Sequence, residues 1–176
     1  RAIIGQPVSS FDFRWMMDSG KIFLCDLSKG ALGEDVSALL GSLVFSKLTL
    51  AALSRQDVSE HDRPIHFLYA DEVQNFAHGA KLPTILSEAR KYNLVLTIAT
   101  QTISQLPRES ADAVFGNCAT LISFRVGGED AETLKREFAT LLPASELQDL
   151  PEYKAYVRTM TSDRPAMPTG PHLVTT

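Results

Sequence analysis

The sequence predicts an α/β fold built on a mostly parallel sheet with helices on both faces. Short apolar runs alternate along the chain with longer segments that have a helical pattern of apolar residues. Most of the short runs are apolar throughout, which is typical of strands covered on both faces. The chain has 176 residues, 44% of them hydrophobic and 22% charged, so it can bury a core and has the composition of a globular domain.

Strands are expected where an apolar run is bounded by glycine or polar residues. This criterion gives residues 21–27, 65–70, 94–99, 119–126 and 153–159. Arg125 falls inside one of these runs, and a guanidinium in a strand needs a partner or an edge position. Its role stays open between a phosphate ligand and half of a buried ion pair.

Helices are expected in the intervals. Residues 33–55 begin with two acidic side chains, which favour a helix start, and are then apolar almost all round, so this helix should pack on more than one side. Pro83 suits the first turn of the next helix, and Asn93 should follow it as a left-handed cap. Further helices are expected at 108–115 and 129–138, and a short one where Ser145 and Gln148 have the spacing of a capping box.

These elements are expected to form one domain portion over residues 1–162, followed by a Pro-rich tail, 163–176, that is extended or mobile. The chain opens on Arg1 instead of methionine, which suggests a fragment. It contains no run of about 18 apolar residues and no basic-then-apolar start, so neither a membrane span nor a leader is expected.

Charge and cysteine content exclude some classes of function. Seventeen basic and twenty-one acidic side chains give a formal charge of −4, without the basic surplus of a stand-alone nucleic-acid binder. Contact with DNA is therefore expected only through a few loops or through an assembly. Cys25 and Cys118 lie in separate apolar runs without metal-ligand spacing, which predicts two buried thiols in a reducing compartment and no zinc site.

Polar residues just after the expected strands are the candidates for chemistry, because functional groups of α/β proteins gather at the carboxyl ends of strands. Asp71 and Glu72 follow strand 65–70 as in a Walker B strand, although strands also end in acids because their ends are wet. Gln101, after the next strand, fits either a phosphate sensor or an ordinary loop residue. Arg90 fits either an arginine finger or a solvated cation that complements a helix dipole.

The sequence contains no phosphate-binding loop of the form GxxxxGK[ST]. The nearest segment, Gly20-Lys21, leads into an expected strand instead of a helix. The four histidines have no metal spacing and no nucleophilic serine or cysteine nearby, so a hydrolase triad is not supported. This chain therefore carries at most half of an ATP site.

Four segments together resemble one family. They are CDLSKGALGEDVSALLGSLVFSKLTLAALSR, FLYADEVQNF, LSEARKYNLVLTIATQTISQL and FGNCATLISFRVGGEDAETL. Over residues 4–160 the chain resembles the TraG/TraD-type coupling proteins of conjugation and type IV secretion, which are related to the HerA/FtsK DNA translocases. Order and spacing support the resemblance, since Arg90 lies 18 residues after Glu72 and Gln101 lies 11 residues after Arg90.

The resemblance implies the carboxyl-terminal portion of a RecA-like P-loop NTPase domain that binds ATP and Mg²⁺, works as a hexamer and pulls DNA through a central pore. Asp71 would be the Walker B acid on the Mg²⁺ side, acting through water, and Glu72 the catalytic carboxylate. Gln101 would be the sensor, in contact with the nucleotide, and Arg90 the finger that crosses the subunit interface.

The resemblance also implies partners and a location. The partners would be DNA, further copies of the chain and proteins of the secretion channel. The chain itself would be cytoplasmic and without membrane contact. The phosphate-binding loop and, where the family has one, an anchor at the inner face of the cell membrane would lie upstream of Arg1, so the fragment alone should be inactive.

Three other classes of protein share parts of this sequence pattern. An interaction domain that keeps the ATPase fold and has lost the site is compatible with the missing phosphate-binding loop. A DExD/H-type helicase is suggested by the sequence DEVQ at residues 71–74 and by Ala99-Thr100, but the Arg-rich motif of that group does not follow. An ABC-type ATPase would need a histidine where Gln101 stands, and it is discounted.

Overall fold

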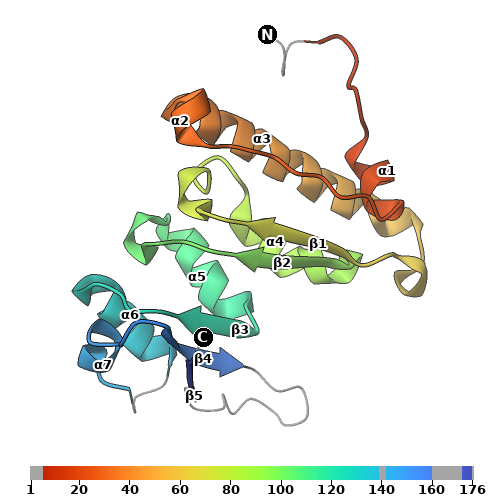
Figure 1. Cartoon of the computed structure of the whole chain (residues 1–176). Coiled ribbons are helices and arrows are strands. Elements are labelled where there is room, and N and C mark those ends of the chain that lie inside the picture. The colour runs from red at the N-terminus through yellow and green to blue at the C-terminus, as the bar shows by residue number, and fades with distance from the viewer. Residues whose placement is uncertain (1–5, 139–141, 160–171, 176) are drawn as a thin grey trace. The chain divides into compact units, whose positions relative to one another are not determined.

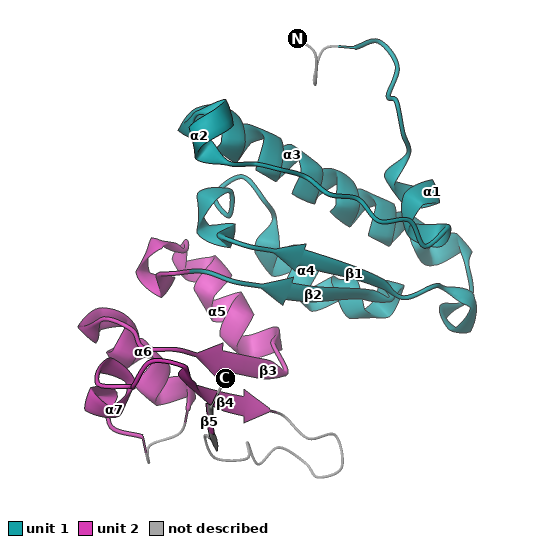
Figure 2. Ribbon diagram, in the orientation of Figure 1, with its two compact units in different colours: residues 1–100 teal, residues 101–176 magenta. Residues whose placement is uncertain are grey.

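The computed structural model describes residues 6–138, 142–159 and 172–175 (Figure 1). The chain forms two compact units, residues 1–100 and 101–176, which have different colours in Figure 2. Each unit combines helices with strands, and the predicted α/β class is confirmed. The division falls inside the stretch that the sequence predicted as one domain portion, 1–162.

The helices of the first unit are α1 (Phe13–Asp18), α2 (Lys29–Leu32), α3 (Glu34–Leu53) and α4 (Leu82–Glu88). The long helix α3 was predicted, and it packs closely on the segment that follows the first strand. A Cβ atom added at Gly41 would lie 2.9 Å from the ring of Phe76, whose centroid lies 5.4 Å from that of Phe45. Glycine at this position therefore permits the close approach.

One helical segment in the described part of the chain, Glu34–Asp57, is long and apolar enough to cross a membrane. This is weak evidence for a span, because the core helix of a globular protein meets the same criterion. Leu40 and Phe45 are buried within the protein, whereas Leu39 and Leu50 are exposed. Within the described residues, the helix packs through one face and not on several sides as predicted.

The strands of the first unit, β1 (His66–Ala70) and β2 (Leu94–Ile98), form a parallel pair that is in register over its whole length. Both lie within the runs predicted from the sequence. α4 and a helical turn at Ala89–Tyr92 provide the crossover that a parallel pair requires. Asn93, with φ 52°, is the predicted left-handed cap between this turn and β2.

Helices on both faces of the sheet were predicted, but one face of the β1–β2 pair is left uncovered by the described residues. Phe67, Tyr69 and Val95 alternate along the strands and are 55%, 72% and 43% exposed. Alternation of exposed and covered side chains means that the helices of this unit protect the other face.

Residues 21–27 were predicted as a strand, and this prediction is wrong for the structure described. The segment belongs to no helix or strand, and Ile22 and Leu24 are each 88% exposed. A strand exists only as part of a hydrogen-bonded ladder, and no described residue pairs with this segment. Its end is fixed by Ser37, whose hydroxyl donates to the carbonyl of Leu27 at 2.6 Å.

The second unit contains an antiparallel sheet in the order β3-β4-β5, where β3 is Thr120–Ser123, β4 is Lys154–Thr159 and β5 is His172–Thr175. A parallel arrangement is therefore wrong for this unit, since an apolar run has the same sequence pattern in either orientation. β5 also lies within the Pro-rich tail, 163–176, for which no strand was predicted.

The helices of the second unit are α5 (Arg108–Asn117), α6 (Gly128–Glu137) and α7 (Ala144–Gln148). Its core gathers apolar side chains of α6, α7 and the adjoining segments: Ala131, Leu134, Phe138, Leu142, Ala144 and Leu147. The first three lie within the helix predicted at residues 129–138. The predicted capping box is wrong, because α7 follows Pro143 without a side-chain cap and Ser145 lies inside the helix.

The prediction of two buried thiols is wrong for Cys25, which is exposed, while Cys118 is half-buried. Cys25 lies in the unpaired segment 21–27, so the burial expected of a strand does not occur there. Both thiols are free, and partial burial of each sulfur raises the pKa of Cys25 and of Cys118.

Candidate functional site

The candidate site lies at the carboxyl end of β1, where the strand delivers two acidic residues. Asp71 is exposed and Glu72 is half-buried. Glu72 has left-handed backbone angles, φ 51° and ψ 44°, a conformation that costs a residue with a side chain about 1 kcal/mol. Its amide donates to the Asp71 Oδ1 atom at 3.0 Å, which orients one carboxylate relative to the other.

Backbone hydrogen bonds join this strand end to the end of β2. The amide of Ala99 donates to the carbonyl of Ala70 at 2.9 Å, and the amide of Val73 donates back to the carbonyl of Ala99 at 3.0 Å. Val73 is fully buried. The turn after Glu72 is therefore held against the neighbouring strand by its own backbone.

Side chains make a second connection between the two strand ends. Gln74 is buried, its amide nitrogen donates to the carboxylate of Glu72, and its amide oxygen accepts a hydrogen bond of 2.8 Å from the hydroxyl of Thr100. Gln74 and Thr100 entered the sequence analysis only through the helicase alternative and were not among the predicted site residues. The signal available in the sequence was the polar pair Gln74-Asn75, which directly follows Val73 after the two acidic residues.

The two carboxylates can hold a magnesium ion only if other groups, such as the phosphates of a nucleotide, supply the remaining ligands. Among the described residues no group of three or more histidine, cysteine, aspartate or glutamate side chains could hold a metal by itself. Mg²⁺ bound with a nucleotide needs only one or two carboxylates, because phosphate oxygens and water complete its shell. The exposed carboxylate of Asp71 is compatible with that arrangement.

Arg90 lies at the opposite end of the β1–β2 pair from the two carboxylates. It is exposed, in the turn Ala89–Tyr92 that precedes β2. β2 has five residues, and a strand rises about 3.3 Å per residue, so Arg90 is separated from Glu72 by the length of the strand. Arg90 therefore does not join Asp71 and Glu72 in a site of the same chain.

Gln101 follows Thr100 directly, is exposed, and begins the second unit. The segment just after it is fixed within that unit by Asp130 at the start of α6. The carboxylate of this buried residue accepts hydrogen bonds from the amides of Ile103 and Ser104, at 3.0 and 3.1 Å. The loop that follows Gln101 is thus anchored to α6.

The arginine buried within a strand is Arg158 of β4, whereas Arg125, predicted to lie inside a strand with its role left open, does not lie in one. Arg125 lies beyond the end of β3 and is exposed, so a place in a buried ion pair is wrong for it. Arg158 is 6% exposed, donates to the carbonyl of Glu137 at 2.6 Å and lies 3.6 Å from the carboxylate of that residue.

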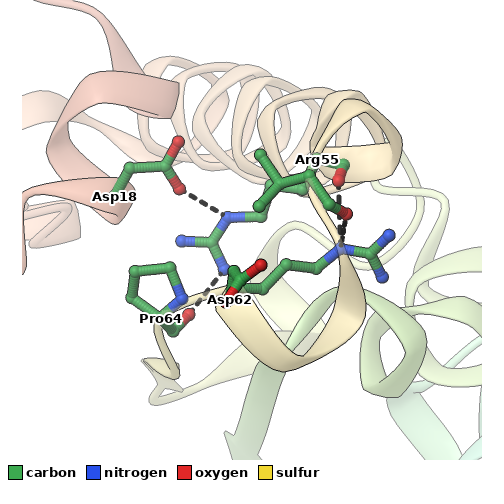
Figure 3. Close-up of a pocket in the computed structure, with 6 residues that line it drawn as sticks. Asp18, Arg55, Asp62 and Pro64 are labelled. Carbon is green, nitrogen blue, oxygen red and sulfur yellow. Dashed lines mark hydrogen bonds and ion pairs between the residues drawn. The ribbon is translucent and has the colours of Figure 1, made fainter.

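A second cluster of charged residues surrounds a cavity of about 220 Å³ at the amino ends of β1 and β2 (Figure 3). Arg55 is fully buried, and its guanidinium pairs with Asp18 at 2.9 Å and donates to the carbonyl of Pro64 at 2.9 Å and to that of Tyr92 at 3.0 Å. Burial lowers the pKa of Arg55 in spite of Asp18. These contacts tie α1 and the end of α3 to the residues that precede both strands.

The guanidinium of Arg63 strengthens the same cluster. Its Nε atom donates to the carbonyls of Arg55 and Val58, at 3.0 and 2.9 Å, and the group lies 5.3 Å from the ring centre of Tyr92. Because both guanidinium groups bond mainly to backbone oxygens, the cluster acts as a structural clamp. It fixes the end of the sheet that lies away from Asp71 and Glu72.

The fold of the chain is similar to part of a RecA-like P-loop NTPase fold. Among solved structures it resembles the plasmid coupling protein TrwB in complex with a non-hydrolysable ATP analogue, with a TM-score of 0.66 and 18% identity over 96% of this chain and 44% of that one. It also resembles TrwB in complex with ADP and Mg²⁺, with a TM-score of 0.63 and 19% identity over 81% of this chain and 37% of that one.

The sequence also matches a known family over part of its length. Residues 64–142 match the family described as the TraM recognition site of TraD and TraG. The resemblance to TraG/TraD-type coupling proteins, carboxyl-terminal part, is therefore confirmed. No curated protein matches the chain. The chain spans less than half the length of the TrwB structures that it matches.

Proposed function

We propose that this chain is part of an ATP-driven motor of conjugative or type IV secretion type that moves DNA, and that it supplies carboxylates to the ATP site. The observation that supports this most strongly is the joined pair of strand ends. It presents Asp71 and Glu72 at the carboxyl end of a parallel pair, where ligands of α/β sheets bind. The structures of TrwB in complex with ADP and Mg²⁺ and with nucleotide analogues add support.

Each candidate residue has a distinct role in this proposal. The Asp71 carboxylate holds Mg²⁺ through water, and the ion neutralises charge on the phosphates when it is bound. Glu72 accepts a hydrogen bond from the attacking water and orients it toward the phosphate. Gln101 contacts the terminal phosphate as the sensor. The chain contains no phosphate-binding loop, so by itself it should hydrolyse no ATP.

The assembly follows from the same proposal. Arg90 lies too far along the sheet to serve its own carboxylates, so it acts as a finger toward the site of a neighbouring copy, in a hexamer. DNA passes through the pore of that hexamer, on the cytoplasmic side of the cell membrane. The family match over residues 64–142 favours this function over a DExD/H-type helicase.

The test is steady-state ATP hydrolysis by the protein as its gene encodes it, with and without DNA, compared with Glu72→Gln. The variant keeps the shape of the side chain and removes its negative charge. We expect DNA to stimulate turnover and the variant to lose it by about a thousandfold. Equal turnover of the two proteins, or none in either, would exclude the proposed motor function.

A second function, recognition of a partner protein, is favoured by the description of the matching family as a TraM recognition site. In that case residues 64–142 bind a TraM-type protein, and the ATPase fold serves as a scaffold. Calorimetric titration of the purified chain with such a protein tests this, with Glu72→Gln as the matched variant. Binding that is equal in both, together with absent ATP turnover, would favour an interaction domain over a motor.

A further inference from the structure

We propose that Gln74 is a positioning residue that holds the Glu72 carboxylate in place and links it to Thr100 at the end of β2. This inference rests on the proposed ATPase function, because it gives a role to a side chain next to the catalytic carboxylate. Gln74 touches no reacting atom. It acts through Glu72.

The chemistry of the three side chains fixes the direction of both hydrogen bonds. An ionised carboxylate can only accept, so the amide nitrogen of Gln74 must be the group that faces Glu72. The amide oxygen then faces Thr100 and accepts from its hydroxyl at 2.8 Å. A side-chain amide can donate at one end and accept at the other, which is what this position requires.

Burial makes these bonds matter. Gln74 is 9% exposed and lies in the turn Val73–Asn75, whose first residue is fully buried and bonded to the carbonyl of Ala99. Water therefore has little access to the amide, and either half of it left without a partner is destabilised. The conformation of the Gln74 side chain is consequently set by its two partners.

The link also connects the two strand ends that the ATP site uses. Glu72 has left-handed backbone angles and carries the carboxylate, whereas Thr100 directly precedes Gln101, the proposed sensor. A shift of Thr100 changes the partner available to Gln74 and so the position of the Glu72 carboxylate. The three residues thus form a route by which the end of β2 influences catalysis.

The test uses the natural-length protein with Gln74→Met, which keeps the length of the side chain and removes both hydrogen bonds. We expect kcat to fall by about ten- to a hundredfold, the loss typical of a misplaced catalytic group, while the KM for ATP stays within about twofold. Thr100→Val should lower kcat in the same way. Thr100→Ser, which keeps the hydroxyl, should have the kcat of the unmodified protein. His78→Gln, an exposed change beyond the same turn, is the control.

A double variant and a measurement without ATP complete the design. Gln74→Met combined with Thr100→Val should be no slower than Gln74→Met alone, because both changes break one route. Urea unfolding should be measured for the unmodified protein, the two single variants Gln74→Met and Thr100→Val, and the double variant. The losses of stability should be non-additive, which reports the hydrogen bond independently of turnover. Additive effects on both kcat and stability would overturn the link between the two residues.

The outcomes separate this inference from the proposed function. Normal turnover in Gln74→Met, with or without reduced stability, gives Gln74 only a structural role and overturns the inference alone. Absent turnover in the unmodified protein, or turnover unaffected by Glu72→Gln, removes the proposed function and the inference with it.

Discussion

Arg55 is the side chain whose replacement should destabilise the first unit most directly. It is fully buried, pairs with Asp18 at 2.9 Å and donates to the carbonyls of Pro64 and Tyr92. Arg55→Met keeps most of the apolar volume of the side chain and removes all three interactions. Since those partners belong to α1 and to the residues before β1 and β2, the change should loosen their attachment to α3.

The expected loss of unfolding free energy in Arg55→Met depends on how exposed each partner of Arg55 is. Removing one member of a buried ion pair costs about 3–5 kcal/mol when the other is left buried and unpaired. Asp18 is 33% exposed and also pairs with Arg14, so leaving Asp18 without Arg55 costs less free energy than that. The two carbonyls that lose a charged donor cost about 1 kcal/mol each or more. We therefore expect a net loss of about 3 kcal/mol in the free energy of unfolding.

Urea unfolding measures this loss, with fluorescence of Trp15, the single tryptophan, as the probe. Trp15 lies in α1, the helix that carries Asp18, so it reports the attachment of α1. With a urea dependence of about 2 kcal/mol per molar, the midpoint should fall by about 1.5 M. Arg125→Met, at an exposed position, is the matched control and should shift it by less than about 0.3 M. Equal midpoints for the two variants would refute the reasoning that Arg55 clamps this unit.

Two further predictions concern packing and ionisation. Gly41→Ala should lower the melting temperature in spite of the better helix propensity of alanine, because the new methyl group meets the ring of Phe76. Gly116→Ala, at a helical position with open space around it, should raise the melting temperature. The hydroxyl of Tyr156 donates to Glu146 at 2.6 Å, which raises the pKa of Tyr156 to about 12, so its phenolate absorbance should develop near pH 12 and at lower pH in Glu146→Gln. Because the folded-state pKa lies above the unfolded value of 10.0, this contribution to stability is complete below pH 10 and is lost as the pH rises toward 12.

Elements fixed by local chemistry could be predicted from the sequence. The apolar run before Asp71 becomes β1, and the run after Asn93 becomes β2, because glycine-free apolar segments between polar turns form strands wherever a neighbour is available. Residues 21–27 have the same composition but find no partner among the described residues. The orientation of β3 and β4 was missed for a related reason, since strand direction depends on chain connectivity and not on composition.

The candidate site could be predicted only in part. A strand end that carries Asp71 and Glu72 is visible in the sequence, because the two residues are adjacent. The hydrogen bond between Gln74 and Thr100 joins positions 26 residues apart and depends on the parallel register of the strands. No local sequence pattern predicts it. For the same reason the guanidinium buried in a strand is that of Arg158 and not that of Arg125, because burial depends on what packs above a strand.

The position of Arg90 leads to a prediction about mixed assemblies. In one chain it lies at the amino end of β2, while Glu72 follows the carboxyl end of β1. Under the proposed function, the two side chains would therefore complete an ATP site between copies. Arg90→Ala and Glu72→Gln should each lower ATP turnover about a thousandfold when assembled alone. When the two variants are mixed in equal amounts, the Arg90→Ala copies still supply Glu72 and the Glu72→Gln copies still supply Arg90, so about a quarter of the interfaces should regain both groups if assembly is random. A mixture no more active than either variant alone would place Arg90 outside the ATP site of a neighbouring copy.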